Sequence, residues 1–292
     1  MVLESFSNPY KAEAHPAWLL LHGAIYTIIA YFLAGWLWPA HRSMVMVFLI
    51  TAACIPLLYN LIKYEEEKDY YEEDEVVLLK EHSKAILAYF LLFCGVTLTI
   101  TLLWLLTPEQ QIYQAFQVQI QTLQAINPHI AITGAATEIT GQASSQMAFF
   151  TRIFLNNMKV LLFCLVFSFL YGAGAIFILV WNGSVLGIAI GDRIRIGVAE
   201  LGVSGFQAAG AYLGVGAQSV FLRYGIHGSL EMIAYIVAGL AGGIISVATI
   251  RHHWSTRKFE RIVLDSADLV LISIAILFVA GVWEAFITPF FY

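Results

Sequence analysis

The residues whose types and spacing could support chemistry are titratable side chains inside apolar stretches of the C-terminal half. His227 and Glu231 are four residues apart, so on a helix they share one face and can reach each other or a common ligand. Glu284 stands near the end of the last apolar stretch. Ionisable groups in such stretches are costly and usually face the interior of a helix bundle. Because histidine and carboxylates also bind metals and carry protons, these three residues define a candidate intramembrane site.

Membrane-spanning helices must position these side chains, because 60% of the residues are hydrophobic, 12% are charged and the mean hydropathy is +0.77. The fold class is therefore all-α membrane, a polytopic helical bundle of about seven transmembrane segments. The formal charge of -5 leaves no basic footprint for nucleic acid. The expected spans cover about residues 18–38, 44–62, 85–106, 159–181, 204–222, 226–250 and 268–288. If the glycine-rich stretch 204–222 is re-entrant, six segments remain.

The distribution of basic residues predicts the orientation, because Lys and Arg near span ends favour the cytoplasmic side. Seven crossings with the N-terminus inside place eleven Lys and Arg residues inside, from Lys11 to Arg261. Four remain outside, and they are Arg42, Arg152, Lys159 and Arg223. We therefore expect a multi-pass protein of the cell membrane with a cytoplasmic N-terminus and an external C-terminus.

Three regions follow from this topology. Residues 1–106 form an N-terminal three-span region, whose cytoplasmic loop 63–84 carries an acidic run that is either solvated or a patch for a partner. Residues 107–148 form an external amphipathic segment, in which Ile112, Phe116, Ile120 and Leu123 recur at helical spacing among glutamines. This segment is expected to lie on the outer surface or to cap the bundle. Residues 149–292 form the C-terminal membrane core.

A polar cluster is predicted at the outer level of that core, where the ends of four helices converge. Three interpretations of it stay open. Its members can satisfy one another and lock the helices; His227, Glu231 and Glu284 can hold a metal or a proton; or the cluster can bind a substrate, a lipid head group or a partner segment. The cluster comprises Arg152, Asn156, Asn157, Arg223, His227, Glu231 and Glu284.

A second polar cluster is predicted at the inner level. Asn182 and Gly183 are expected to end the fourth span as an Asn-Gly turn and cap. Asp192 then falls in a short helix over 184–199, and Asp268 opens the seventh span at the same depth.

Pairs of glycines four residues apart predict close helix packing, because small residues let helix backbones approach in lipid. Each pair serves either packing within the chain or a face for a dimer. The pairs are Gly187 with Gly191, Gly210 with Gly214, and Gly239 with Gly243.

Several of these elements, in this order, resemble the stage II sporulation protein M family over roughly residues 149–292. They are Asn156-Asn157 before an apolar span, Gly172 within it, Asn182-Gly183 followed by Gly187, His227-Gly-x-x-Glu231 with Gly239 and Gly242, and Trp283-Glu284-Ala-Phe-Ile-Thr-Pro289. The first two spans and the acidic loop are similar to the family's variable N-terminal region. In spore-forming bacteria the family member works with a peptidoglycan hydrolase and a third membrane protein in engulfment and septal wall thinning. The resemblance implies a non-enzymatic integral membrane protein, without carrying a sporulation role to this chain.

The leading hypothesis is a membrane scaffold or complex subunit for envelope remodelling, with the lipid bilayer, a second copy or other envelope proteins as partners. One rival is a transporter or channel that uses His227, Glu231 and Glu284. Another is a metal-dependent intramembrane hydrolase built on the same residues. No cofactor is expected apart from a candidate metal at that site.

Overall fold

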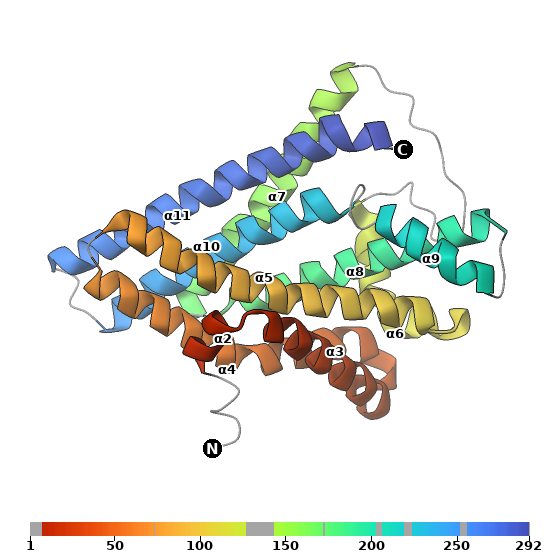
Figure 1. Cartoon of the computed structure of the whole chain (residues 1–292), viewed down its shortest axis with the longest axis horizontal. Coiled ribbons are helices and arrows are strands. Elements are labelled where there is room, and N and C mark those ends of the chain that lie inside the picture. The colour runs from red at the N-terminus through yellow and green to blue at the C-terminus, as the bar shows by residue number, and fades with distance from the viewer. Residues whose placement is uncertain are drawn as a thin grey trace.

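The computed structural model describes residues 8–72, 74–126, 143–171, 173–202, 206–218, 224–251 and 256–291, which are helical with short turns and contain no strand (Figure 1). Its helices, in chain order, are α2 (Pro9–Ala14), α3 (Ala17–Leu37), η1 (Pro39–His41), α4 (Arg42–Tyr71), α5 (Glu75–Leu106), α6 (Glu109–Ile126), α7 (Ala143–Tyr171), α8 (Ala175–Glu200), α9 (Phe206–Gln218), α10 (Ile226–Arg251) and α11 (Arg257–Val282), followed by the π turn η3 (Trp283–Ile287) and η4 (Thr288–Phe291). The expected all-α bundle is confirmed.

Seven helices within the described residues are long and apolar enough to cross a membrane, namely α3, α4, α5, α7, α8, α10 and α11. The number agrees with the sequence prediction, but two of the predicted spans are wrong. The stretch 159–181 contains the break between α7 and α8, where a Cβ on Gly174 would lie 2.3 Å from the carbonyl oxygen of Phe167. The stretch 204–222 contains α9, whose 13 residues extend about 20 Å, short of the roughly 30 Å of a hydrocarbon core.

Because the spans differ from the predicted ones, the residues of the predicted inner-level cluster do not lie together. Asn182 and Gly183 lie inside α8 rather than at a cap, and Asn182 Nδ2 donates to the Ile178 carbonyl at 2.8 Å. The short helix over 184–199 is likewise part of α8, so Asp192 lies toward the far end of that helix. Asp268 is exposed on α11. Within the described residues, no hydrogen bond or ion pair joins Asn182, Asp192 and Asp268.

Arg195, near the end of α8, shows which ends of the helices meet. One of its terminal nitrogens, Nη2, donates to the carbonyls of Trp104, Leu105 and Thr107, at 2.8, 3.1 and 2.9 Å. These carbonyls are at the C-terminal end of α5, where helix carbonyls lack partners within the helix. The end of α8 therefore lies beside the end of α5 and the start of α6.

The centre of the bundle is α10, of whose most apolar window 78% is buried, against 17% for α7. It contacts α4, α5, α7, α8 and α11. Two glycines on α10 belong to this packing. A Cβ on Gly239 would lie 2.9 Å from the Ala175 Cβ of α8, and Gly243 is buried.

The other predicted glycine pairs differ in what they face. A Cβ on Gly187 would lie 2.7 Å from the Thr97 carbonyl oxygen, and one on Gly191 would lie 2.7 Å from the Trp104 ring, so this pair seats α8 on α5. Gly210 and Gly214 on α9 have nothing within 4 Å of such a Cβ. One pair therefore packs inside the chain, whereas the α9 pair leaves an open face.

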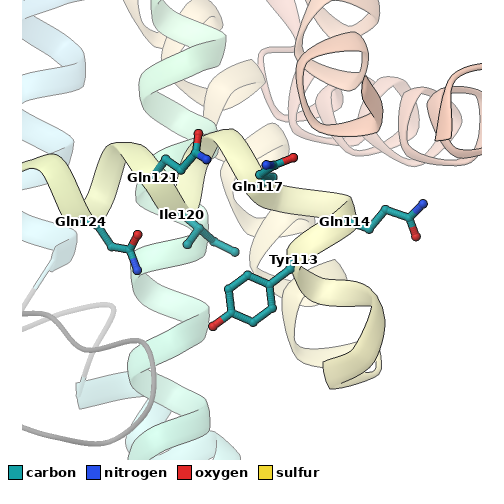
Figure 2. A pocket seen from close by; sticks show the side chains of 6 residues that line it. All are labelled: Tyr113, Gln114, Gln117, Ile120, Gln121 and Gln124. Atoms are coloured by element: carbon teal, nitrogen blue, oxygen red, sulfur yellow. The ribbon is translucent and has the colours of Figure 1, made fainter. Parts of the chain in front are cut away.

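The amphipathic helix expected after the third span is α6, which lies with α9 at the right-hand end of the bundle in Figure 1. Ile112, Phe116 and Ile120 are buried against the bundle, as the stripe of apolar residues predicts. Gln119 is also fully buried and accepts a hydrogen bond from the Ser43 hydroxyl of α4. Next to Ile120, α6 also bears an open pocket of about 390 Å³, whose lining residues are Tyr113, Gln114, Gln117, Ile120, Gln121 and Gln124 (Figure 2).

At the end of the bundle opposite α6 and α9, the ends of four helices lie beyond the apolar layer. The start of α8 marks the edge of that layer, because it packs beside Ile62 of α4 and Tyr89 of α5 around a small cavity. Beyond Ile62 the sequence of α4 becomes charged. With 30 and 32 residues, α4 and α5 extend about 45 and 48 Å, well beyond a hydrocarbon core of roughly 30 Å. The ends of α4, α5, α10 and α11 meet on the left in Figure 1. Together they form what we call the helical extension, and α2 packs against the α4 and α5 parts of it.

Candidate functional site

Three of the predicted outer-cluster residues meet inside the bundle. Asn157 on α7 donates from Nδ2 to Glu231 Oε1 on α10. The carboxyl groups of Glu231 and Glu284 lie close to each other. Side chains from α7, α10 and the end of α11 are thereby joined, which agrees with the depth that the sequence assigned to them. We call these three residues the carboxyl site.

A local departure from α-helical geometry presents Glu284 to this site. After Val282 the helix widens into the π turn η3, and the Thr288 backbone N–H bonds the Trp283 carbonyl. The Thr288 hydroxyl donates to the same carbonyl at 3.2 Å. Single π turns within α-helices are frequent at functional sites. The π turn changes the direction of the side chains at the end of α11, and Glu284 lies within this turn.

Aromatic residues fix α11 against α7 beside the carboxyl site. The rings of Phe150 and Phe154 are stacked, with 5.7 Å between their centroids. The ring of Phe278 meets both edge-on, with centroid distances of 5.6 Å to Phe150 and 6.0 Å to Phe154. Gly281 leaves room for this contact, because a Cβ there would lie 3.2 Å from the Phe150 ring. The position of Glu284 is thus set by packing as well as by its polar partner.

His227 and Asn156, which also belong to the predicted cluster, do not join the carboxyl site. His227 is buried with its ring 6.2 Å from that of Tyr224, and none of the described residues hydrogen-bonds its Nδ1. No hydrogen bond or ion pair in the described part of the chain joins His227 to Glu231 or Glu284. Arg152 and Asn156 are exposed on α7. Arg223 and Gly172 lie outside the described residues.

No group of three or more His, Cys, Asp or Glu side chains in the described ranges is arranged to hold a metal ion. His227, Glu231 and Glu284 are therefore not brought around one ion. What the carboxyl site can do is bind a proton between two carboxyl groups and hold three helices together.

A second site, which the sequence interpretation missed, lies in the helical extension. The acidic loop 63–84 was expected to be either solvated or a patch for a partner. For three of its carboxylates solvation is wrong, because Glu65, Glu66 and Asp69 are each 0% exposed. His82 of α5 lies between two of them, with Nδ1 2.7 Å from Glu65 Oε2 and Nε2 2.9 Å from Asp69 Oδ1. His82 Nδ1 is hydrogen-bonded to Glu65, whereas Nε2 meets the geometry of an ion pair with Asp69 without that of a hydrogen bond.

Further ion pairs extend this site across five helices, and together we call it the ionic network. Lys68 Nζ lies 2.8 Å from Glu13 Oε2 on α2 and 2.7 Å from Glu65 Oε1. Arg251 at the end of α10 pairs with Glu66 at 3.1 Å. Arg261 of α11 donates to the Asp69 carbonyl at 3.0 Å. The network joins α2, α4, α5, α10 and α11, so it connects the two halves of the chain.

A signal for this network was present in the sequence. Cys54, Leu58, Leu61, Glu65 and Asp69 follow one another at intervals of three or four residues, and all five are buried on one face of α4. The buried stripe of the helix therefore continues into the charged segment. Carboxylates that continue an apolar stripe predict buried ion pairs, whereas the overall charge of the segment predicts solvent.

The described fold, with its helices of spanning length and a polar site inside the bundle, defines a polytopic α-helical membrane protein. The chain belongs to the stage II sporulation protein M family, whose family model matches residues 44–289. The match contains both the carboxyl site and, apart from Glu13, the residues of the ionic network. No curated relative and no solved structure shows a significant match to the chain.

Proposed function

We propose that this multi-pass membrane protein is a non-enzymatic scaffold or subunit of a membrane complex for envelope remodelling. The observation that carries the proposal is the use of intramembrane polar groups as ties between helices. Asn157, Glu231 and Glu284 join α7, α10 and α11, and Arg195 joins α8 to α5. Such ties suit a rigid frame that presents fixed surfaces at its two ends.

Tight packing within the bundle supports the same role. Near Ile62, Tyr89 and Gly239, helices α4, α5, α7, α8 and α10 enclose a cavity of about 10 Å³. This volume is at the lower limit for holding a single water molecule. The frame is therefore closely filled at the level where α7 turns into α8.

The surface for self-association is proposed to lie on α9. The glycine pairs of α8 and α10 serve contacts inside the chain, whereas Gly210 and Gly214 face open space and Leu213 between them is 76% exposed. Small residues with an exposed leucine form the close-contact face that membrane helices use. We expect Leu213→Cys to form a disulfide-linked dimer in native membranes, and Ile250→Cys, 79% exposed on α10, to remain monomeric. Dimers of both variants would contradict the assignment of this face.

The orientation is proposed with the helical extension in the cytoplasm. Its end of the bundle carries Lys11, Lys63, Lys68, Lys80, Lys84, Arg251, Arg257, Lys258 and Arg261. In the observed spans Arg193 and Arg195 lie at the end opposite the helical extension. The excess of Lys and Arg on the side of the extension is therefore smaller than the sequence predicted, but it keeps the same sign. In intact cells an impermeant thiol reagent should label Tyr113→Cys on α6 and leave Glu67→Cys unlabelled until the cells are permeabilised. The reverse labelling pattern would contradict this orientation.

A transporter is the second candidate, and the contact between Glu231 and Glu284 favours it. Carboxyl groups are costly inside a membrane and often mark proton or ion pathways. The two roles differ in liposomes that contain the purified protein and a pH-sensitive dye. A scaffold gives proton flux equal to that of empty liposomes. A flux above that level, abolished by Glu231→Gln and retained by the exposed-site control Asn156→Asp, would replace the scaffold by a transporter.

A further inference from the structure

The position of α2 depends on contacts with the helical extension. With six residues, α2 is too short to be stable alone in water. Its Ala12 is 5% exposed, and the ring of Tyr10 lies 4.4 Å from that of Tyr64 on α4. Lys68 Nζ holds both oxygens of Glu13, at 2.9 and 2.8 Å. The contact between Lys68 and Glu13 is therefore a main link between α2 and α4.

Negative charge is in excess at this seat. Lys68 Nζ also contacts Glu65 Oε1 at 2.7 Å and Glu81 Oε2 at 3.5 Å, so one ammonium group faces three carboxyl groups. The groups that surround Glu13 are Tyr10 on its own helix, Tyr64, Glu65 and Lys68 on α4, and Glu81 and His82 on α5.

The contact between Glu13 and Glu65 identifies the group that responds to this excess. Both carboxyl groups contact Lys68 Nζ, at 2.8 Å for Glu13 and 2.7 Å for Glu65. They are therefore close neighbours, and two carboxyl groups so placed favour a proton on one of them. The other oxygen of Glu65 is already engaged by His82 at 2.7 Å. Since Glu65 is 0% exposed and Glu13 lies at the edge of the network, Glu13 is the carboxyl that exchanges its proton with solvent.

We propose that α2 is a proton-operated latch, which is closed on the helical extension when the Glu13–Glu65 contact holds a proton and opens when that proton is lost. The latch is independent of the scaffold role and of the carboxyl site. Opening would uncover the part of the ionic network formed by Glu65 and Lys68. The proposal thus describes a device by which pH changes the surface of the extension.

The working range follows from the environment of Glu13. Burial, and then the neighbouring carboxyl group of Glu65, raise the pKa of Glu13 from 4.5 to about 7, although Lys68 opposes the shift. Because the pKa of Glu13 is higher in the closed state than in the open state, binding of a proton favours the closed state. The stabilisation is fully present below pH 4.5 and is lost as the pH rises to about 7. Over that interval the opening equilibrium increases about tenfold per pH unit.

Hydrogen exchange of the whole protein in lipid nanodiscs tests the latch. The amides of Ala12 and His15 report on α2, since they donate to the carbonyls of Asn8 and Lys11. The exchange rate is compared between the native chain and Glu13→Gln at each pH from 5 to 8.5, so that the intrinsic pH dependence of exchange cancels. We expect the ratio of native to variant rates to rise about tenfold per pH unit from 5 toward 7 and then level off.

Two outcomes would overturn the proposal. One is a ratio that stays constant over the whole range. The other is a Glu13→Gln chain that exchanges at every pH as fast as the native chain does at pH 8, because the contact would then seat α2 without holding a proton. The matched control is Glu67→Gln, which alters an exposed carboxylate on α4 and should follow the native pH profile. If Glu67→Gln also abolished the pH dependence, Glu13 would not be the group responsible.

Discussion

Replacing His82 by alanine is the most direct test of the ionic network. The substitution leaves Glu65 and Asp69, both 0% exposed, without the imidazole that lies 2.7 and 2.9 Å from them. Removing one partner of a buried ion pair costs about 3–5 kcal/mol. We expect the lower end of this range, about 3 kcal/mol, since Lys68 still contacts Glu65 at 2.7 Å. That loss corresponds to a factor of roughly 10² in the unfolding equilibrium.

The measurement is equilibrium unfolding in mixed detergent micelles, followed by loss of helical signal. His41→Ala is the matched control, because His41 is exposed at the turn η1 and should alter stability by less than about 0.5 kcal/mol. Replacing Glu65, Asp69 and His82 together by leucine or methionine should be neutral or stabilising, since buried ion pairs are seldom better than apolar packing. A loss below about 1 kcal/mol for His82→Ala would refute the view that the imidazole holds the two carboxylates together.

Two further substitutions test the packing of the bundle by the same unfolding measurement. Gly23→Ala should destabilise the protein by about 1–3 kcal/mol, because the new Cβ would lie 2.1 Å from the Leu92 carbonyl oxygen, whereas Gly210→Ala has nothing within 4 Å and should gain up to about 1 kcal/mol from helix propensity. Equal effects of the two would contradict the close crossing of α3 and α5. Arg195→Met should cost about 1–3 kcal/mol, because three carbonyls at the end of α5 lose their donor. Arg193→Met removes only an exposed ion pair of 3.9 Å and should cost less than about 0.5 kcal/mol; a larger loss there than at Arg195 would contradict the role given to Arg195.

Hydropathy predicted the number of spans but misplaced two of them for a physical reason. The turn between α7 and α8 is formed by small, apolar residues such as Ala173 and Gly174, so the average hydropathy continues through it. Conversely, the polar residues Arg152, Asn156 and Asn157 were expected to precede the fourth span, whereas they lie inside α7. A helix accommodates such residues when a partner on another helix is available, as Glu231 is for Asn157.

The convergence of Glu231 and Glu284 was predictable because helix order alone sets the depth of each residue. The failure of His227 to join them was not, because depth does not specify the direction in which a side chain points. A spacing of four residues places His227 and Glu231 on one face of α10. Glu231 turns toward α7 and α11, while His227 packs beside Tyr224.

The sequence by itself determined the helical membrane class, the family and the residues that could carry charge into the bundle, because composition and helical periodicity are local properties of the chain. Only the tertiary structure decided which of those charges meet. The network around His82 assembles groups from α2, α4, α5, α10 and α11, and single contacts in it join residues up to 192 positions apart in the chain. Whether a carboxylate is solvated or buried depends on the helices that cover it. The C-terminal helices help to cover this part of α4, because Arg261 of α11 donates to the Asp69 carbonyl and Arg251 of α10 pairs with Glu66.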